Sequence, residues 1–364
     1  MNQCFLPLNS SINELEFVYT NELEKLNLFN NGIKDQIEII LGQTYFLPDV
    51  LTAFKSFSTA LAPLVNPPID FREGQLKVKD MNNKYDIYDK YFEVTRVKDM
   101  TSGQFVQQYL DTSAELIDEI QYTSMSRGEI AYILKAWEAA NKIILLDKQP
   151  SPDFKLDDVN RSAVPKDNDQ RALYRWKLAH HGFAIFMIFS GHCFDKARTG
   201  IANGEDDNII LDWLDKGAHL FRATAGCMEF GNSFTATVYR SVIRPDMSRA
   251  NEEVNLPNGF SGTQNFDYME WRKHKVALIN LVKEYKEQGR ISPIVMEGLE
   301  MFRAYYLEDM HIHSIIASRM VGMEKSLLQA GFMGKAGKPV KLTAADVLRT
   351  MGKMRDKELE FLMN

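Results

Sequence analysis

Apolar residues recur every three or four positions along most of the chain, the spacing that places side chains on one face of an α-helix. This pattern predicts helices over residues 12–28, 33–41, 48–64, 103–120, 128–146, 170–201, 209–227, 266–288, 292–323 and 344–363. Strand-like alternation is rare by comparison. The sequence therefore predicts an all-α fold in which a bundle of helices encloses the core.

One short segment departs from the helical pattern. Residues 76–80 and 85–88 alternate apolar and polar side chains on either side of Asn82 and Asn83. Because asparagine is common in tight turns, we expect a small β-hairpin here.

A polar stretch over residues 147–169 divides the chain. It contains Pro150, Pro152 and Pro165 and shows no sustained periodicity, as expected of a linker. We therefore predict a small helical N-terminal domain over residues 1–150 and a large helical domain over residues 151–364. Two segments of the larger domain, 244–264 and 331–339, are rich in Gly, Pro and polar residues and are expected to be long loops.

Composition narrows the classes of partner. Of the 364 residues, 45% are hydrophobic and 11% aromatic, enough to fill a large core. The net charge is −6 and the chain has no block of basic residues, so nucleic acid is not an expected partner. The first residues lack the features of a signal peptide, and no apolar run reaches the roughly 20 residues that span a bilayer. We expect a cytoplasmic protein, and homo-oligomerisation is left open.

The cysteines do not form a metal-binding motif. Cys4, Cys193 and Cys227 are odd in number and widely spaced, which excludes a CxxC-type zinc site and fits reduced thiols.

His313 is the most informative residue of the sequence. It lies in the predicted helix 292–323, and the residues expected on its face are mostly apolar: Leu299, Phe302, Tyr306, Met310, Ala317 and Met320. An axial heme ligand needs such surroundings, but a core histidine bonded to a backbone carbonyl has the same spacing. The pattern alone leaves both interpretations open.

Four segments of the second half of the chain carry a family resemblance. They are residues 178–187, residues 221–226 with 231–240, residues 259–264, and residues 313–322, which end in Arg319-Met-Val-Gly. In this order they resemble the heme-dependent tryptophan dioxygenase and indoleamine dioxygenase superfamily, which includes the ring-rearranging enzyme of pyrrolnitrin biosynthesis. The resemblance covers about half of the chain.

The resemblance implies a helical heme b domain and an oxygenase of the dioxygenase type, with O2 and an indole, tryptophan-like or other aromatic amino acid as substrates. His313 would be the axial ligand of the heme iron, and the heme contacts would be completed by Gly262, Tyr306 and Arg319. The catalytic pocket would be formed by Phe183, Met187, Arg222, Ser261 and Gly262. The substrate would be held by Phe183, Phe221, Arg222 and Thr263.

Each role suits the chemistry of its residue. The planar fork of Arg222 can pair with both oxygens of a substrate carboxylate. Phe183 would stack on the substrate ring, with Met187 one turn later on the same face. Small residues such as Gly262 let the backbone approach a porphyrin closely. Glu270 and Asp309 are candidates for a carboxylate that tunes the axial histidine, although Asp309 fits a solvated helix charge equally well.

The sequence departs from the resemblance at three places. Ala218 stands where tryptophan dioxygenases have a tyrosine one turn before the arginine. A distal histidine would have to be His180 or His181, neither of which is in clear register. The glycine-rich loop that closes over the substrate is represented at best by residues 334–337. These departures make L-tryptophan a doubtful substrate.

Two other function classes stay open at this point. Asp309 and His313 lie four residues apart, so with Glu297, Glu300, His180 or His181 they fit a nonheme iron or diiron oxygenase. The chain could also be a helical heme- or small-molecule-binding protein without catalysis, because a fold does not guarantee a reaction.

Overall fold

The computed structural model describes residues 4–7, 83–97, 100, 102–120, 122–145, 168–247, 265–321 and 344–362. The α-helices of these residues are α3 (Asn83–Tyr91), α4 (Ser102–Ile120), α5 (Arg127–Leu145), α6 (Asn168–Asn203), α7 (Asp207–Gly231), α8 (Ala236–Val238), α10 (Phe266–Glu287), α11 (Pro293–Met320) and α12 (Ala344–Leu359). A π-helical turn, η2 (Tyr239–Ile243), follows α8, and a 3-10 turn, η5 (Glu360–Leu362), follows α12. The all-α prediction is confirmed.

The seven predicted helices from residue 103 onward are confirmed, with ends that differ by a few residues. Their starts are set by capping side chains. Asp206 accepts a hydrogen bond from the Asn208 amide at the start of α7, and Asn265 accepts one from the Tyr268 amide at the start of α10. Ser292 does the same for α11, whose first residue is a proline. The helices predicted over residues 12–28, 33–41 and 48–64 lie outside the described residues.

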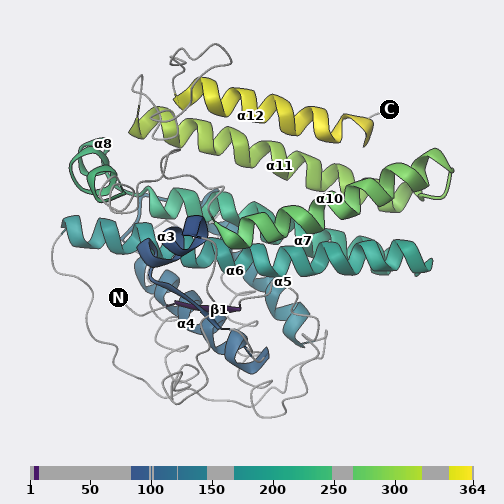
Figure 1. Ribbon diagram of the computed structural model, residues 1–364, viewed down its shortest axis with the longest axis horizontal. Coiled ribbons are helices and arrows are strands. Elements are labelled where there is room, and N and C mark those ends of the chain that lie inside the picture. The colour runs from purple at the N-terminus through teal and green to yellow at the C-terminus, as the bar shows by residue number, and fades with distance from the viewer. Residues whose placement is uncertain are drawn as a thin grey trace, which may run out of the picture.

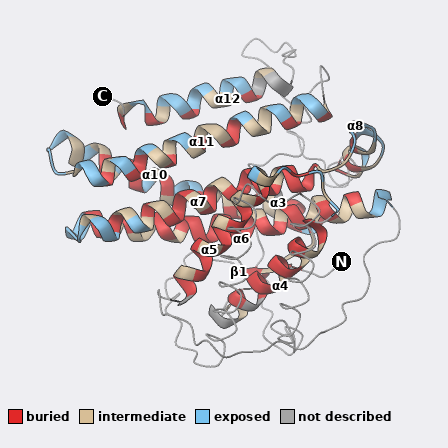
Figure 2. Ribbon diagram, turned by 180° about the vertical axis from the view of Figure 1, so that it is seen from behind, coloured by how far each residue is buried: buried red, intermediate tan, exposed pale blue. Residues whose placement is uncertain are grey.

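Helices α6 and α7 form the middle layer of the molecule. Helices α10, α11 and α12 lie on one side of this pair, with α12 outermost, and α4 and α5 lie on the other (Figure 1). Residues 184–191 of α6 are all buried, because this helix is covered on every side (Figure 2). The α6–α7 contact is close: a Cβ on Gly217 would lie 2.7 Å from Cε1 of Phe194.

The hydrophobic core continues across the predicted domain boundary. Ile117 of α4 and Trp137 of α5 belong to the same buried cluster as Phe186 of α6 and Leu220 of α7. The predicted linker between these helices lies mostly outside the described residues, so the division at residue 150 stays a prediction.

The hairpin prediction is wrong for its second half. Residues 85–88 belong to α3, and the buried side chains Ile87, Tyr88 and Tyr91 follow helical spacing. The predicted first strand, residues 76–80, lies outside the described residues. A strand pair is formed elsewhere, between β1 (Cys4–Pro7) and β2 (Val94–Val97), which run parallel.

The predicted loop over residues 244–264 is also corrected at its start. Residues 244–247 are helical and continue the turn η2, while residues 248–264 lie outside the described part of the chain. Among the helices that the structure describes, none is long and apolar enough to cross a membrane.

Candidate functional site around His313

His313 lies on the inner face of α11, in the C-terminal third of the helix. Leu299, Phe302, Tyr306, Met310 and Met320, which were predicted to share its face, are all buried, and Ala317 is half-buried. The predicted apolar face is therefore confirmed.

His313 itself is the exception on this face. Asp309 and Met310 in the turn before it and Ile316 in the turn after it are buried, whereas His313 is only half-buried. Desolvation nevertheless lowers the pKa of its imidazole, against the opposing charge of Asp309. The side chain therefore keeps some accessible surface among largely buried neighbours, and the lowered pKa favours the neutral form of the ring.

The imidazole of His313 has no hydrogen-bond or ion-pair partner among the described residues. His180 and His181 differ from it in this respect. Nδ1 of His180 bonds the carbonyl of Trp176 at 2.7 Å, and Nε2 of His181 bonds the carbonyl of Phe92 at 2.5 Å. Burial lowers the pKa of His180 to about 3 and also lowers that of His181. These two are satisfied core histidines, whereas His313 keeps its ring nitrogens unpaired.

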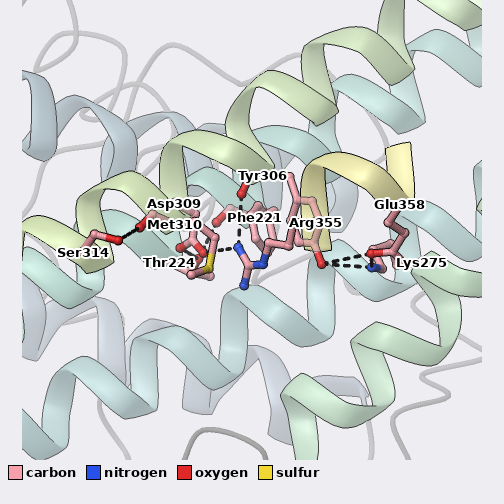
Figure 3. A network of polar contacts seen from close by, with 9 residues as sticks. All are labelled: Phe221, Thr224, Lys275, Tyr306, Asp309, Met310, Ser314, Arg355 and Glu358. Atoms are coloured by element: carbon pink, nitrogen blue, oxygen red, sulfur yellow. Dashed lines mark hydrogen bonds and ion pairs between the residues drawn. The ribbon is translucent and has the colours of Figure 1, made fainter. Parts of the chain in front are cut away.

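Asp309 is a buried, paired carboxylate rather than a solvated helix charge. Its Oδ2 lies 2.6 Å from Nη1 of Arg355, and its Oδ1 accepts a hydrogen bond from the Thr224 hydroxyl at 3.3 Å. Figure 3 shows how this carboxylate joins helices α7, α11 and α12. Glu270, the other predicted tuning carboxylate, pairs with Lys273 on its own helix.

A second buried ion pair lies beside Tyr306. Nζ of Lys275 lies 2.6 Å from Oε2 of Glu358 and 3.0 Å from the Tyr306 hydroxyl (Figure 3). The Arg355 guanidinium also donates to the Tyr306 carbonyl at 3.1 Å and lies 4.2 Å from the centre of its ring. Tyr306 is thus held from both sides by cations.

Several predicted pocket residues form one aromatic and apolar cluster. The Phe221 ring stacks on Trp271, with ring centres 4.7 Å apart, and meets Tyr306 edge-on at 5.4 Å. Met187 is buried in the same cluster, and Phe183 packs at its border. The structure therefore brings Met187, Phe183, Phe221 and Tyr306 together, although Phe221 is completely buried.

Arg222 of α7 contacts a different part of α11. Its Nε and Nη2 bond both carboxylate oxygens of Glu308, at 2.6 and 2.9 Å. The guanidinium lies over the rings of Tyr132 and Tyr305, at 4.1 and 4.2 Å from their centres. In this structure a carboxylate of the protein itself pairs with Arg222, and the role of Arg222 in binding a substrate carboxylate stays a prediction.

The remaining predicted residues divide into two groups. Arg319 lies on the α11 surface and pairs with Glu229 of α7 at 2.8 Å. Ser261, Gly262 and Thr263, together with residues 334–337, lie outside the described residues.

A small hydrophobic cluster lies one to two turns beyond His313. Met247 packs in one cluster with Ile316 and Met320, and Val321 packs against the same cluster.

The described residues contain no group of three or more His, Cys, Asp or Glu side chains that could hold a metal ion. Asp309 is engaged by Arg355, so the carboxylate–histidine pair proposed for a nonheme iron site is not assembled.

Comparison with known proteins places the chain in a family. Residues 43–290 match the family model of the SfmD 3-methyl-L-tyrosine peroxygenase, more than half of the chain. The chain belongs to the SfmD family. Its members are named as peroxygenases, a class of oxidoreductase.

A solved structure supports the same fold. The crystal structure of SfmD reduced by soaking with sodium hydrosulfite matches with a TM-score of 0.50 and 16% sequence identity, over 86% of this chain and 96% of that chain. No curated protein sequence matches the chain.

The SfmD family match includes only part of the candidate site. Phe183, Met187, Phe221 and Arg222 lie within residues 43–290, whereas His313 and the α11–α12 network lie beyond them. That network was missed by sequence reasoning. Arg355 and Asp309 are 46 positions apart, and only the packing of α12 on α11 reveals the pair.

The buried amine of Lys275 makes the stability of the folded protein depend on pH, and this dependence can be measured. Desolvation lowers its pKa from 10.5 to about 8, although the Glu358 carboxylate opposes this shift. Between these pH values the unfolded chain keeps a proton that the folded chain has lost, so the stability attributable to Lys275 rises with pH from about 8 and levels off near 10.5.

The measurement is the free energy of unfolding of the wild type minus that of Lys275→Met, across this pH range. We predict that the difference increases with pH. Lys273→Met, an exposed lysine on the same helix, controls for the loss of one charge. A difference that stays flat for Lys275→Met would show that its ammonium carries no burial cost.

Proposed function

We propose that this protein is a heme-dependent oxygen-transferring enzyme acting on an aromatic amino acid, with His313 as the axial ligand. The observation that carries the proposal is the half-buried imidazole of His313 on the inner face of α11, which has no hydrogen-bond or ion-pair partner among the described residues. Membership of the SfmD 3-methyl-L-tyrosine peroxygenase family supports the reaction class and a tyrosine-like substrate.

The residues around His313 fit the proposed group. A neutral imidazole offers a lone pair to iron, and the neighbouring side chains of Met310, Ile316 and Met320 are apolar, which suits the face of a macrocycle. The SfmD crystal was reduced with sodium hydrosulfite, which is consistent with a redox-active group in that protein. When bound, heme b would supply the iron at which oxygen is transferred to the aromatic ring.

The protein's own residues would bind and orient the substrate. Arg222 is proposed to receive the substrate carboxylate in place of Glu308, with Tyr132 and Tyr305 keeping the guanidinium plane fixed. Phe183, at the border of the aromatic cluster, is proposed to contact the substrate ring. Water is excluded by the buried wall of Phe221, Phe302 and Tyr306.

The oxidant distinguishes two forms of the proposal. A peroxygenase takes its oxygen atom from a peroxide, whereas the resemblance to tryptophan and indoleamine dioxygenases implies O2. The family match favours peroxide and a phenolic amino acid over O2 and an indole.

His313→Ala is predicted to abolish stoichiometric hemin binding while the helical circular dichroism stays unchanged, because only the axial bond is lost. The measurement is a hemin titration followed by the Soret band, with His180→Ala as the matched histidine control. The loaded wild type should hydroxylate 3-methyl-L-tyrosine with hydrogen peroxide.

Hemin binding by His313→Ala equal to the wild type would refute the ligand assignment. Turnover of tryptophan with O2 and a reductant, but none with peroxide, would replace the peroxygenase form by the dioxygenase form.

Glu308→Gln is predicted to tighten binding of 3-methyl-L-tyrosine by about tenfold, since a charged hydrogen-bonded competitor is removed from Arg222. Binding of 2-methylphenol, which has no carboxylate, should not change. Tyr132→Phe is the matched control, because it removes one hydrogen bond to Glu308 and leaves the carboxylate charged. Equal effects of Glu308→Gln on both ligands would contradict the role of Arg222.

A further inference from the structure

The carboxylate of Asp309 and the imidazole of His313 lie one helical turn apart on the same face of α11. A carboxylate one turn away could accept the N–H of the ring. Oδ2 of Asp309 instead lies 2.6 Å from Nη1 of Arg355, and its Oδ1 lies 3.3 Å from the Thr224 hydroxyl, which also donates to the Phe221 carbonyl at 2.6 Å. Among the described residues, the ring of His313 has no hydrogen bond to this carboxylate.

We propose that Arg355 is a positioning residue that holds the Asp309 carboxylate away from His313 and thereby sets the electron donation of the axial imidazole. This inference rests on the proposed heme function and names a determinant of that same site. The expected direction of the effect follows from the opposite arrangement, in which a carboxylate accepts the second N–H of the imidazole. An imidazole that donates its second N–H to a carboxylate becomes a stronger, more anionic ligand.

Arg355 is fixed tightly enough for this role. Nη1 of its guanidinium donates to the Tyr306 carbonyl, at 3.1 Å, as well as to Asp309, and the guanidinium carbon lies 4.2 Å from the centre of the Tyr306 ring. The side chain is almost entirely buried, and Asp309 is 5% exposed. Arg355 therefore cannot leave the carboxylate without breaking buried contacts.

The helix that supplies Arg355 is anchored by the residues that follow it. Asp356 pairs with Arg303 of α11, and Glu358 pairs with Lys275 of α10 at 2.6 Å. Farther on, the Phe361 carbonyl accepts a hydrogen bond from Lys286 of α10 at 2.7 Å. Helix α12 therefore delivers one guanidinium to the turn that precedes His313.

The test uses full-length protein loaded with hemin. Arg355→Met removes the cation and its hydrogen bonds while keeping a long apolar side chain. We expect a downward shift of the heme reduction potential and a higher frequency of the iron–histidine stretching band in the ferrous state, because Asp309 then accepts the ring N–H. Arg355→Lys should restore part of both shifts.

The double variant Arg355→Met with Asp309→Asn should return both readouts to wild-type values, since no carboxylate remains to act on the ring. Glu358→Gln is the matched control. It weakens the attachment of the same helix one turn later and leaves the Asp309–Arg355 pair intact.

Two results would overturn the inference while hemin binding at His313 stands. The first is an unchanged potential and stretching band in Arg355→Met, and the second is an equal shift in Glu358→Gln. Failure of the wild type to take up hemin would instead overturn the proposed function, and the inference with it. A hemin titration of the wild type shows that outcome before any Arg355 variant is made.

Discussion

The packing of the inner face of α11 is the constraint on which the candidate site depends. A helix of 28 residues that packs against the α6–α7 layer has to bury this face, and most of its residues there are buried from Val295 to Met320. On the face of His313, only His313 and Ala317 are half-buried. The candidate site lies at the first of these two positions.

The surroundings of this turn make it rigid rather than adaptable. Aromatic stacking of Phe221 on Trp271 fixes α7 against α10, and two buried ion pairs fix α12 against α11 and α10. Buried polar groups of this kind are costly unless every member is paired, and here each charge has an opposite charge within hydrogen-bond distance. A preorganised wall of this type suits a flat, rigid cofactor and a fixed substrate orientation.

Helical periodicity was sufficient to predict the helices from residue 103 onward, because amphipathic spacing is a local property. The same local reasoning misread α3, where tyrosines and aspartates alternate over a short segment. It identified the apolar face of His313, whereas the role of Arg222 stays a prediction. It could not show that Glu308 pairs with Arg222 or that Arg355 pairs with Asp309, because those contacts depend on how separate helices are rotated against each other.

The most direct test of the central claim is a crystal structure of the hemin-loaded protein, with anomalous scattering used to place the iron. The account predicts one iron bonded to a ring nitrogen of His313, with the macrocycle against the inner face of α11 and the Asp309–Arg355 pair intact. An iron bound by any other side chain, or a macrocycle away from this turn of α11, would contradict it.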